Sequence, residues 1–506
     1  MAESEQQLSR VLSWKSGAFL GLSTVLGIFV TIGFMVGLVG AWAVIFIWAV
    51  CMVMAAAQAF LYAEMATMFP STVGGSAAYA HEAFRKYTVF VGPVVMWGYW
   101  LGWSLIQAVS AYVFGSLIQA QWFPSQTWGV DILGTHVGLP HILGGLALIS
   151  VYVLNAYGIK PAARLTSAGV TVFVVVAAVM VGLPFVSGTW SAHELTWRLH
   201  SWQLGVVLVY LAAWTCFAAE GPSLFAPEYK KPGSDTPKAI KICAVVMVAM
   251  FTLVPLATSG AIGEKAIGDN PSGYAVTVMQ KYWHGSSSLI IAILAMALWV
   301  TILATSAQSA RALLGLARSD ATIKQFAKVN RHKMPGRALA MDILVNLLIL
   351  FLVGNTVAIV GASNFGYIIS CSLISFGYVL LRRDRPNWPR PYKLPRTGIA
   401  IALLMGTIDL FLAIFGVTHP ALANYGGAKE SIIAVVLLFV SVPLFLYRRV
   451  WQDRGTPFQW REDTPVLPDE ATAALLHAPG SDGSASNNYN PADISPTLPD
   501  AATDHN

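Results

Sequence analysis

Apolar residues along this chain come in blocks of about twenty, separated by short segments rich in glycine, proline and charged residues. A helix of this length and composition crosses the ~30 Å hydrocarbon core of a bilayer. The pattern therefore predicts an all-α membrane protein with about 12 transmembrane helices. We place these at 18–38, 43–66, 90–118, 140–157, 164–187, 205–226, 239–262, 287–316, 338–354, 358–381, 398–417 and 430–447.

The composition supports a membrane protein. The chain is 56% hydrophobic and 11% charged, whereas a soluble domain carries about 25% charged residues. The four cysteines lie in apolar blocks without CxxC spacing, so we expect neither a disulfide framework nor a metal site. The spans contain no paired catalytic groups such as HExxH, and we predict neither an enzyme nor a cofactor.

The basic residues predict the orientation, because Lys and Arg resist translocation across the membrane. With the N-terminus in the cytoplasm, alternate loops become internal and hold nearly all of the 31 basic residues. The exceptions are Arg198, Lys265, Lys281 and Lys429. We therefore predict a multi-pass protein of the inner (plasma) membrane with both termini cytoplasmic. The net charge of +6 is then an insertion signal, and nucleic-acid binding is not expected.

The first span combines glycines with hydroxyl side chains. The segment GLSTVLGIFVTIG places Gly21, Gly27 and Gly33 beside Ser23 and Thr24. Small residues allow a helix to open and expose backbone amides, and they equally allow close packing between helices. The segment alone favours neither interpretation.

The sixth span carries an acidic residue inside an apolar segment. The sequence LAAWTCFAAEGPSLFAPEYKKP contains Trp214, Phe217, Glu220, Gly221 and Pro222. Proline removes a backbone hydrogen bond, and a carboxylate at membrane depth is costly, so such places are functional candidates. A simple kink with Glu220 near the cytoplasmic end is the structural alternative.

Interrupted helices at matching positions of two halves indicate an inverted-repeat transporter with its substrate site between them. Helix ends expose N–H groups that suit a substrate carboxylate, while carbonyl ends and Glu220 suit an ammonium. We therefore predict transport of an amino acid or a related small amine. Glu220 is the candidate for proton coupling.

From about residue 10 to 447, the chain resembles the amino acid–polyamine–organocation (APC) transporters. The order of its motifs carries the resemblance, since each piece alone is weak. The matches are GIF at Gly27 to Phe29, YAEMATMFPSTVGGSAAYAHEAF at Tyr62 to Phe84, WTCFAAEG at Trp214 to Gly221, EYKKP followed by TPKAI between Glu228 and Ile240, and RPYKLP at Arg390 to Pro395.

The resemblance implies a LeuT-like fold that works by alternating access. Two inverted five-helix repeats would be followed by two extra helices. The implied organisation is a cytoplasmic N-terminus at 1–17, repeats at 18–187 and 205–381, helices 11 and 12 at 398–447, and a disordered cytoplasmic tail at 455–506. The tail assignment also follows from its Pro-, Ser- and Asn-rich composition.

The resemblance also suggests a site. Trp214 lies where arginine/agmatine exchangers have a gating and substrate-stacking tryptophan, and Glu220 lies where they have the coupling glutamate. Glu64 is a gate contact or a solvated helix end, with equal weight. The expected substrate-binding residues are Ser23, Thr24, Val25, Leu26, Gly27, Gln107, Trp214, Phe217, Ala218, Thr301 and Tyr367.

Two departures from those relatives weaken the assignment. The exchangers have Gly-Ser-Gly in the first helix, where this chain has Val25-Leu26-Gly27. Some relatives have a coupling lysine in helix five, and the segment LTSAGVTVFVVVAAVM contains none. Asp342 and Asp409 lie outside the expected central site, and we interpret both as structural.

Several alternatives stay open. The protein could be a symporter or an antiporter, and the coupling ion a proton or, with less support, sodium held by Ser23, Thr24 and Thr301 or Thr305. A polyamine, ethanolamine or γ-aminobutyrate permease and a transporter-like nutrient sensor are the alternative functions. A homodimer is left open. The expected partners are a small amino acid or amine and the lipid bilayer.

Overall fold

The computed structural model describes residues 8–132, 135–193, 195–271, 273–353, 356–423, 425–454 and 458–464. The side chains at 26–31, 356–358 and 362 are outside this description. Helices occupy every predicted span, and ten of the helical segments within the described residues are long and apolar enough to cross a membrane. The predicted all-α class is confirmed.

The first seven spans are built from the following segments. They are α1 (Trp14–Leu22), η2 (Ser23–Gly27) and α2 (Ile28–Val39) in the first span, then α3 (Ala41–Met68), α5 (Val91–Trp122), α6 (Leu139–Ala156), α7 (Ile159–Val186), α8 (Trp202–Cys216) with η3 (Phe217–Glu228), and α9 (Pro232–Asp269). Within α9, Gly263 has a φ of 80°, and this break coincides with the predicted end of the seventh span.

The remaining spans follow in chain order. They are α11 (Ser287–Arg318), α12 (Gly336–Leu352), α13 (Thr356–Asp384), α14 (Thr397–Thr418), and α15 (Ala428–Phe439) continued by α16 (Ser441–Tyr447) and η6 (Arg448–Gln452). Short elements lie between spans: α4 (Ser76–Phe84), β1 (Gly129–Ile132), β2 (Thr135–Gly138), α10 (Tyr274–Tyr282), η4 (Lys324–Ala327) and η5 (Pro420–Ala423).

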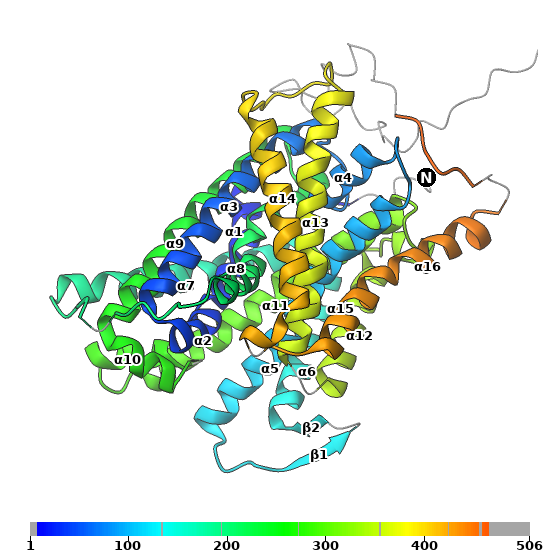
Figure 1. Cartoon of the computed structure of the whole chain (residues 1–506). Coiled ribbons are helices and arrows are strands. Elements are labelled where there is room, and N and C mark those ends of the chain that lie inside the picture. Colours follow the sequence, from blue (N-terminus) through cyan, green and yellow to red (C-terminus); the bar gives the residue numbers. More distant parts are fainter. Residues whose placement is uncertain are drawn as a thin grey trace, which may run out of the picture.

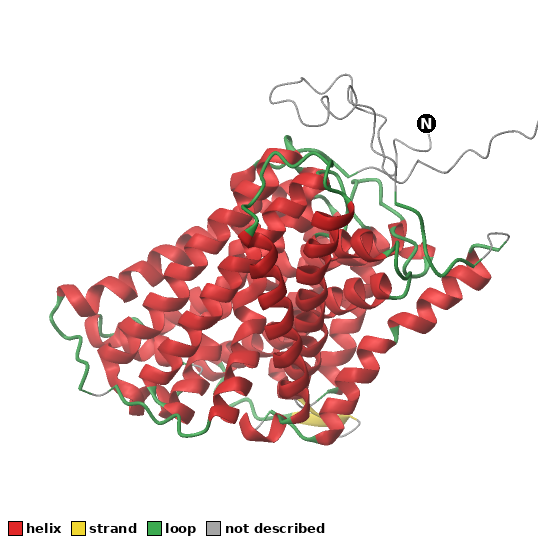
Figure 2. Ribbon diagram, turned by 45° about the horizontal axis from the view of Figure 1, so that its top comes forward, coloured by secondary structure: helices red, strands yellow, loops and turns green. Residues whose placement is uncertain are grey.

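The loops gather at the two ends of the helical bundle (Figure 2). The described N-terminal residues and α4 lie at one end, and α10 with the antiparallel hairpin of β1 and β2 lies at the other (Figure 1). The prediction placed no strand in this loop. In the predicted topology, the first end is cytoplasmic and the second is external.

Packing between the two halves follows a regular rule. The first span packs on the sixth through α1 and η3, the second on the seventh through α3 and α9, and the third on the eighth through α5 and α11. The fourth and ninth spans, α6 and α12, are also in contact. Trp48 of α3 stacks on Phe251 of α9 with ring centroids 5.0 Å apart. An inverted repeat predicts this pairing, and the repeat boundaries stay a prediction.

Part of the predicted disordered tail is described. Residues 458–464 run as a strap along the loop between α4 and α5. The N–H of Val89 donates to the carbonyl of Trp460 at 3.1 Å, and the N–H of Glu462 donates to the carbonyl of Arg85 at 2.9 Å. The rest of the tail lies outside the described residues.

The Glu462 carboxylate anchors this strap. It forms ion pairs with Arg85, at 2.8 Å, and with Arg449 of η6. Burial raises the pKa of Glu462, but Arg449 and Arg85 lower it more, so the pKa lies below its usual value. The carboxylate is therefore charged at neutral pH, and the strap joins the last span to the loop before α5.

Replacing Glu462 with Ala should detach the strap. Hydrogen bonds to charged groups contribute about 1.5–3 kcal/mol each, so losing them should speed hydrogen exchange at the Val89 amide by about tenfold or more. Mass-spectrometric exchange of the purified protein measures this. The control is Glu430→Ala, since Glu430 caps α15 through the Gly427 N–H. Unchanged exchange at Val89 would show that Glu462 does not hold the strap.

Candidate functional site

The first span does not unwind at the predicted break but continues as the 3-10 helix η2. The hydroxyls of Ser23 and Thr24 donate back to the carbonyls of Leu20, at 2.7 Å, and Gly21, at 3.1 Å. Such local bonds compete with the α-helical pattern. At the position where we expected the helix to open, it instead tightens into a 3-10 helix.

Side chains of α11 take up carbonyls near this change. The Thr301 hydroxyl donates to the Ser23 carbonyl at 3.1 Å, and the Gln308 amide donates to the Leu20 carbonyl at 2.8 Å. Unpaired peptide groups are costly inside a bilayer. These two contacts from the eighth span therefore stabilise the irregular part of the first.

The sixth span changes from α8 to the 3-10 helix η3 at Phe217, one turn before Glu220. Pro222 and Pro227 lie inside η3 and remove two backbone donors. The Tyr229 hydroxyl donates to the Pro222 carbonyl at 3.1 Å. Gly221 allows a close approach, because a Cβ there would lie 2.9 Å from Cη2 of Trp103.

The carboxyl group of Glu220 is buried at this bend, with 1% of the residue exposed. Its Oε1 accepts a hydrogen bond of 2.6 Å from the Tyr367 hydroxyl of α13, which also contacts the Phe217 carbonyl at 3.1 Å. Within the described residues, Oε2 has no hydrogen-bond partner. A buried carboxylate with one oxygen unsatisfied is unfavourable unless a proton or a cation compensates for it.

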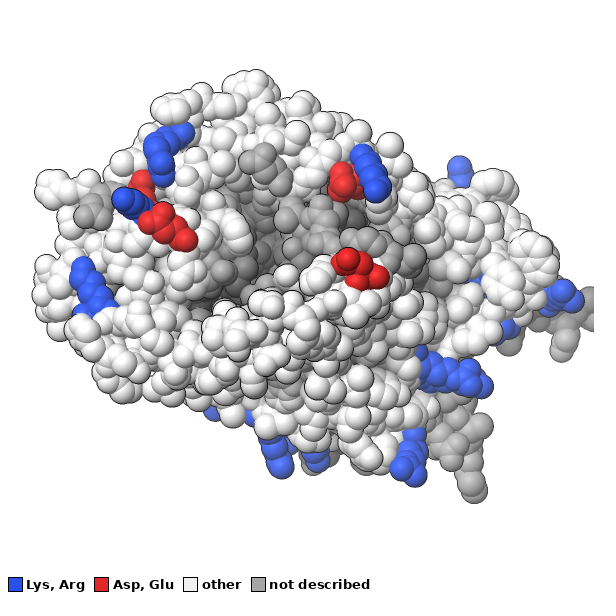
Figure 3. Space-filling view, turned by 90° about the horizontal axis from the view of Figure 1, so that it is seen from below, with Lys and Arg blue, Asp and Glu red and all other residues white. Residues whose placement is uncertain are grey.

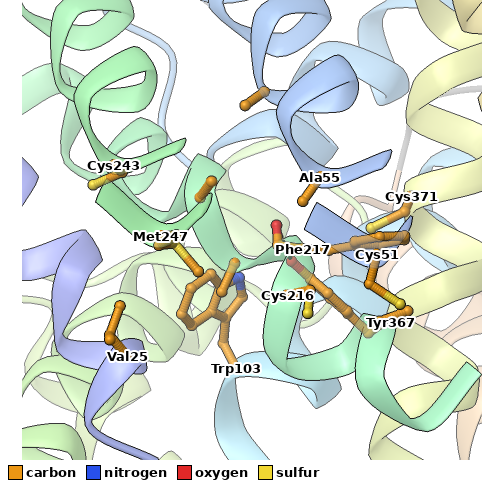
Figure 4. Close-up of a cluster of buried hydrophobic side chains, with 14 of the residues drawn as sticks. Val25, Cys51, Ala55, Trp103, Cys216, Phe217, Cys243, Met247, Tyr367 and Cys371 are labelled. Carbon is orange, nitrogen blue, oxygen red and sulfur yellow. Dashed lines mark hydrogen bonds between the residues drawn. The ribbon is translucent and has the colours of Figure 1, made fainter. Parts of the chain in front are cut away.

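Aromatic rings surround Glu220. The ring of Tyr367 lies 6.0 Å from that of Tyr99 and 6.4 Å, edge-on, from that of Trp103. Figure 4 shows Trp103 among the same buried side chains as Val25, Phe217 and Tyr367. The hydroxyl of Tyr99 and Nε1 of Trp103 have no hydrogen-bond partner among the described residues. The cluster thus combines apolar surface with polar atoms that could bind a ligand.

Of the predicted site residues, Val25, Phe217 and Tyr367 lie in this cluster (Figure 4). Ser23 and Thr24 of η2, Ala218 of η3 and Thr301 of α11 are also buried, and Thr301 contacts the Ser23 carbonyl. Trp214 is partly buried near the end of α8 and packs against the core. Leu26 and Gly27 belong to the η2 backbone, and their side-chain positions lie outside the described residues.

Gln107 lies in a different contact. Its amide nitrogen donates to Asp342 of α12 at 2.7 Å and to Ser309 of α11 at 3.0 Å. Asp342 also accepts from Trp100 at 3.1 Å and from Ser309 at 2.6 Å. This network joins α5, α11 and α12, so the structure does not bring Gln107 to Glu220 through a hydrogen bond. It also fits the structural interpretation of Asp342.

Glu64 ends in a dense ion-pair cluster at the predicted cytoplasmic end. Its Oε2 accepts from Arg382 at 2.6 Å, from the Tyr378 hydroxyl at 2.8 Å and from the Leu394 N–H at 2.8 Å. Arg390 approaches Oε1 at 3.4 Å. The solvated alternative for Glu64 is wrong, because 1% of the residue is exposed.

A second ion pair closes the same end and was missed by the sequence prediction. Arg311 of α11 pairs with Glu228 at the end of η3, and both side chains are fully buried. The guanidinium also donates to the Ala307 carbonyl at 2.7 Å and lies over the Phe225 ring. An arginine in an apolar span is a signal for a buried partner, but the sequence does not identify that partner.

The N-terminal segment covers this ion pair. The N–H groups of Val11 and Leu12 both donate to the Glu228 carbonyl at 2.9 Å, and the N–H of Lys230 donates to the Leu12 carbonyl at 2.9 Å. Residues before the first span are thereby hydrogen-bonded to the end of the sixth. The predicted cytoplasmic end is closed by side chains and by backbone.

The opposite face is hollowed in its middle (Figure 3). A cavity of about 610 Å³ on this side is lined by residues of α9, α10 and the loops next to them, including Ser191, Gly260, Lys281 and His284. This cavity shares no lining residue with the cluster around Glu220. It is therefore separate from the candidate site.

Comparison with known proteins agrees with this arrangement. The family model "Amino acid permease" matches residues 12–442. The chain is 24% identical over 420 residues to the rice polyamine transporter PUT1 (Oryza sativa), covering 81% of this chain and 73% of that protein. It is 25% identical over 474 residues to the branched-chain amino acid permease BcaP of Bacillus subtilis, covering 88% of this chain and 94% of the permease.

Replacing Gly221 with Ala should destabilise the protein by about 1–3 kcal/mol, because the added methyl overlaps Trp103 and Gln308 in a packed core. Thermal unfolding in detergent measures the change. Gly182→Ala in α7 is the matched control, since a Cβ there meets nothing within 4 Å and alanine favours a helix by about 0.5–1 kcal/mol. Equal stability of the two variants would show that Trp103 and Gln308 leave room for a methyl group at Gly221.

Proposed function

The chain belongs to the amino acid permease family and is a secondary transporter of amino acids or amines, and from this premise we propose that Glu220 couples substrate transport to protons by alternating access. The observation that carries the proposal is the half-satisfied carboxyl group of Glu220: Tyr367 donates to one oxygen, and the other has no hydrogen-bond partner in the described part of the chain. A proton or a substrate ammonium would each complete it.

Neutralisation links this carboxyl group to transport. A buried charge without a partner is costly, so the closed site is favoured when Glu220 carries a proton or pairs with a cation. Glu220 also lies where the sixth span changes to η3, and Tyr367 joins that bend to the tenth span. Charge at Glu220 therefore acts directly on the contact between two spans.

The two ends of the molecule support alternating access. The face with α10 and the β1–β2 hairpin is hollowed (Figure 3), and the other end is closed by the ion pairs of Glu64 and of Arg311 with Glu228. We propose that the hollowed face is external, in the plasma membrane, with both termini in the cytoplasm. Opening to the cytoplasm then requires these ion pairs to separate.

The proposed substrate carries one ammonium group on a small, partly apolar body. A single carboxyl matches one ammonium, and the rings of Tyr99, Trp103 and Tyr367 offer apolar surface and cation–π contacts. Relatives include both polyamine transporters and a branched-chain amino acid permease. An amino acid fits this site best, with a polyamine, ethanolamine or γ-aminobutyrate as alternatives.

Replacing Glu220 with Gln should abolish proton-driven accumulation. If one proton is coupled to each substrate, a pH difference of about one unit supports up to roughly tenfold accumulation, because one unit corresponds to about 1.36 kcal/mol. In proteoliposomes with labelled leucine, arginine or putrescine, the wild type should reach this level with one sign of the pH gradient. Acid outside would drive symport, and acid inside would drive antiport.

The Gln variant should equilibrate its substrate without accumulating it, since Gln keeps the contact with Tyr367 but does not titrate. Glu430→Gln, in the first turn of α15, is the control. Undiminished proton-driven accumulation by Glu220→Gln would end the assignment. Accumulation driven by a sodium gradient alone would favour sodium coupling, and no counterflow of any probe would favour a sensor.

A further inference from the structure

A second carboxyl group is buried deep in the bundle without full compensation. Asp409 lies near the middle of α14 with no exposed surface. Its Oδ2 accepts a hydrogen bond of 2.7 Å from the Gln58 amide of α3. Within the described residues, its Oδ1 has no hydrogen-bond partner. Nothing in the coupling role of Glu220 uses this group.

Hydrogen bonds link Asp409 to the tenth span. The Tyr62 hydroxyl of α3 lies 3.5 Å from Oε1 of Gln58 and donates to the Cys371 carbonyl of α13 at 3.3 Å. Cys371 is one helical turn from Tyr367, whose hydroxyl binds Glu220. Contacts therefore run from α14 through α3 to α13 and on to the bend of the sixth span.

The surroundings of Asp409 contain little that could stabilise a charge. Among the described residues, α14 packs mainly against α3, α8, α13 and α15. The titratable groups that interact electrostatically with Asp409 are Tyr62 from α3 and Cys371 from α13. Both side chains are buried and uncharged at neutral pH. From α8, Tyr210 packs against Gly416, about two turns further along α14. Gln58 is the one side chain that hydrogen-bonds to the Asp409 carboxyl group among the described residues.

Asp342 provides an internal comparison. It is equally buried, but its oxygens accept hydrogen bonds from Trp100, Gln107 and Ser309. Three donors can stabilise a buried carboxylate, whereas one donor leaves most of the desolvation cost in place. The same residue type thus occurs in two environments, and the environment of Asp409 favours its neutral form.

We propose that Asp409 is a second protonation site, a positioning residue that holds α3 against α13 and α14 and sets the rate of substrate exchange. This inference rests on the proposed transport function and adds a second site to the coupling role proposed for Glu220. Protonation forms an O–H bond at the unpartnered Oδ1 and removes the buried charge. Loss of that proton to water leaves a carboxylate with one donor, which destabilises this packing and slows the cycle.

Counterflow at equal pH on both sides of the membrane tests the proposal, because no pH gradient then drives net transport. The probe is labelled leucine, arginine or putrescine, whichever the wild type exchanges fastest. Wild-type counterflow should fall about tenfold or more as the pH is raised on both sides. Asp409→Asn, which resembles the protonated form, should show a clearly smaller fall than the wild type over the same pH range. Asp342→Asn is the matched control, and its counterflow should fall with rising pH as in the wild type.

A wild-type pH profile in Asp409→Asn, with counterflow retained, would overturn the proposal. A purely structural role would lower the rate at every pH and leave the profile unchanged. The test of Asp409 can also fail independently of the test of Glu220. Loss of accumulation in Glu220→Gln together with a wild-type profile in Asp409→Asn would reject Asp409 alone. The reverse pair of results would reject Glu220 and leave Asp409 standing.

A second measurement tests the proposal even if the Asp409→Asn variant does not fold. Purified Glu220→Gln protein retains Asp409, and its infrared spectrum at neutral pH should contain the carbonyl stretch of a protonated carboxyl group that disappears at alkaline pH. The spectrum needs folded protein but no transport. Absence of this band would show that Asp409 is not protonated in the resting protein, and the proposal would fail.

Discussion

Every peptide group and every charge inside the bilayer needs a partner from the protein itself, and this requirement governs the whole structure. Where the first and sixth spans leave the α-helical pattern, side chains of other spans take up the carbonyls. Thr301 and Gln308 do so for the first span, and the Tyr367 hydroxyl contacts the carbonyl of Phe217 in the sixth. The irregular segments are therefore located where neighbouring spans can support them.

The same requirement sorts the buried acidic residues. Glu64 and Glu228 are engaged in ion pairs with arginines, and Asp342 is engaged by three neutral donors. Glu220 and Asp409 each have one bonded oxygen and one that is unpartnered among the described residues. Engaged groups hold spans together in this conformation. A carboxyl group with one unpartnered oxygen can gain or lose a proton, and the free-energy cost of doing so depends on the conformation. Coupling of proton binding to transport requires this dependence.

The closed end of the molecule depends on partners that are distant in sequence. Glu64 of the second span is held by the end of the tenth span and the loop after it, and Glu228 by the eighth span and the N-terminal segment. The described strap of the C-terminal tail adds contacts to the loop before α5. Spans from both halves and both described terminal segments thus meet at one end, so any opening there rearranges several of them together.

The sequence by itself determined the spans, their all-α class and the family resemblance, because twenty-residue apolar blocks and their motifs are local properties. It also identified Glu220, since a carboxylate followed by Gly-Pro in an apolar segment is unusual wherever it is found. Only the tertiary structure decided which polar groups face one another. It showed that Gln107 bonds to Asp342 and that Arg311 pairs with Glu228. It also showed that Glu64 is buried and that Gln58 bonds only one oxygen of Asp409. These outcomes depend on contacts between residues far apart in the chain, and local pattern carries no information about them.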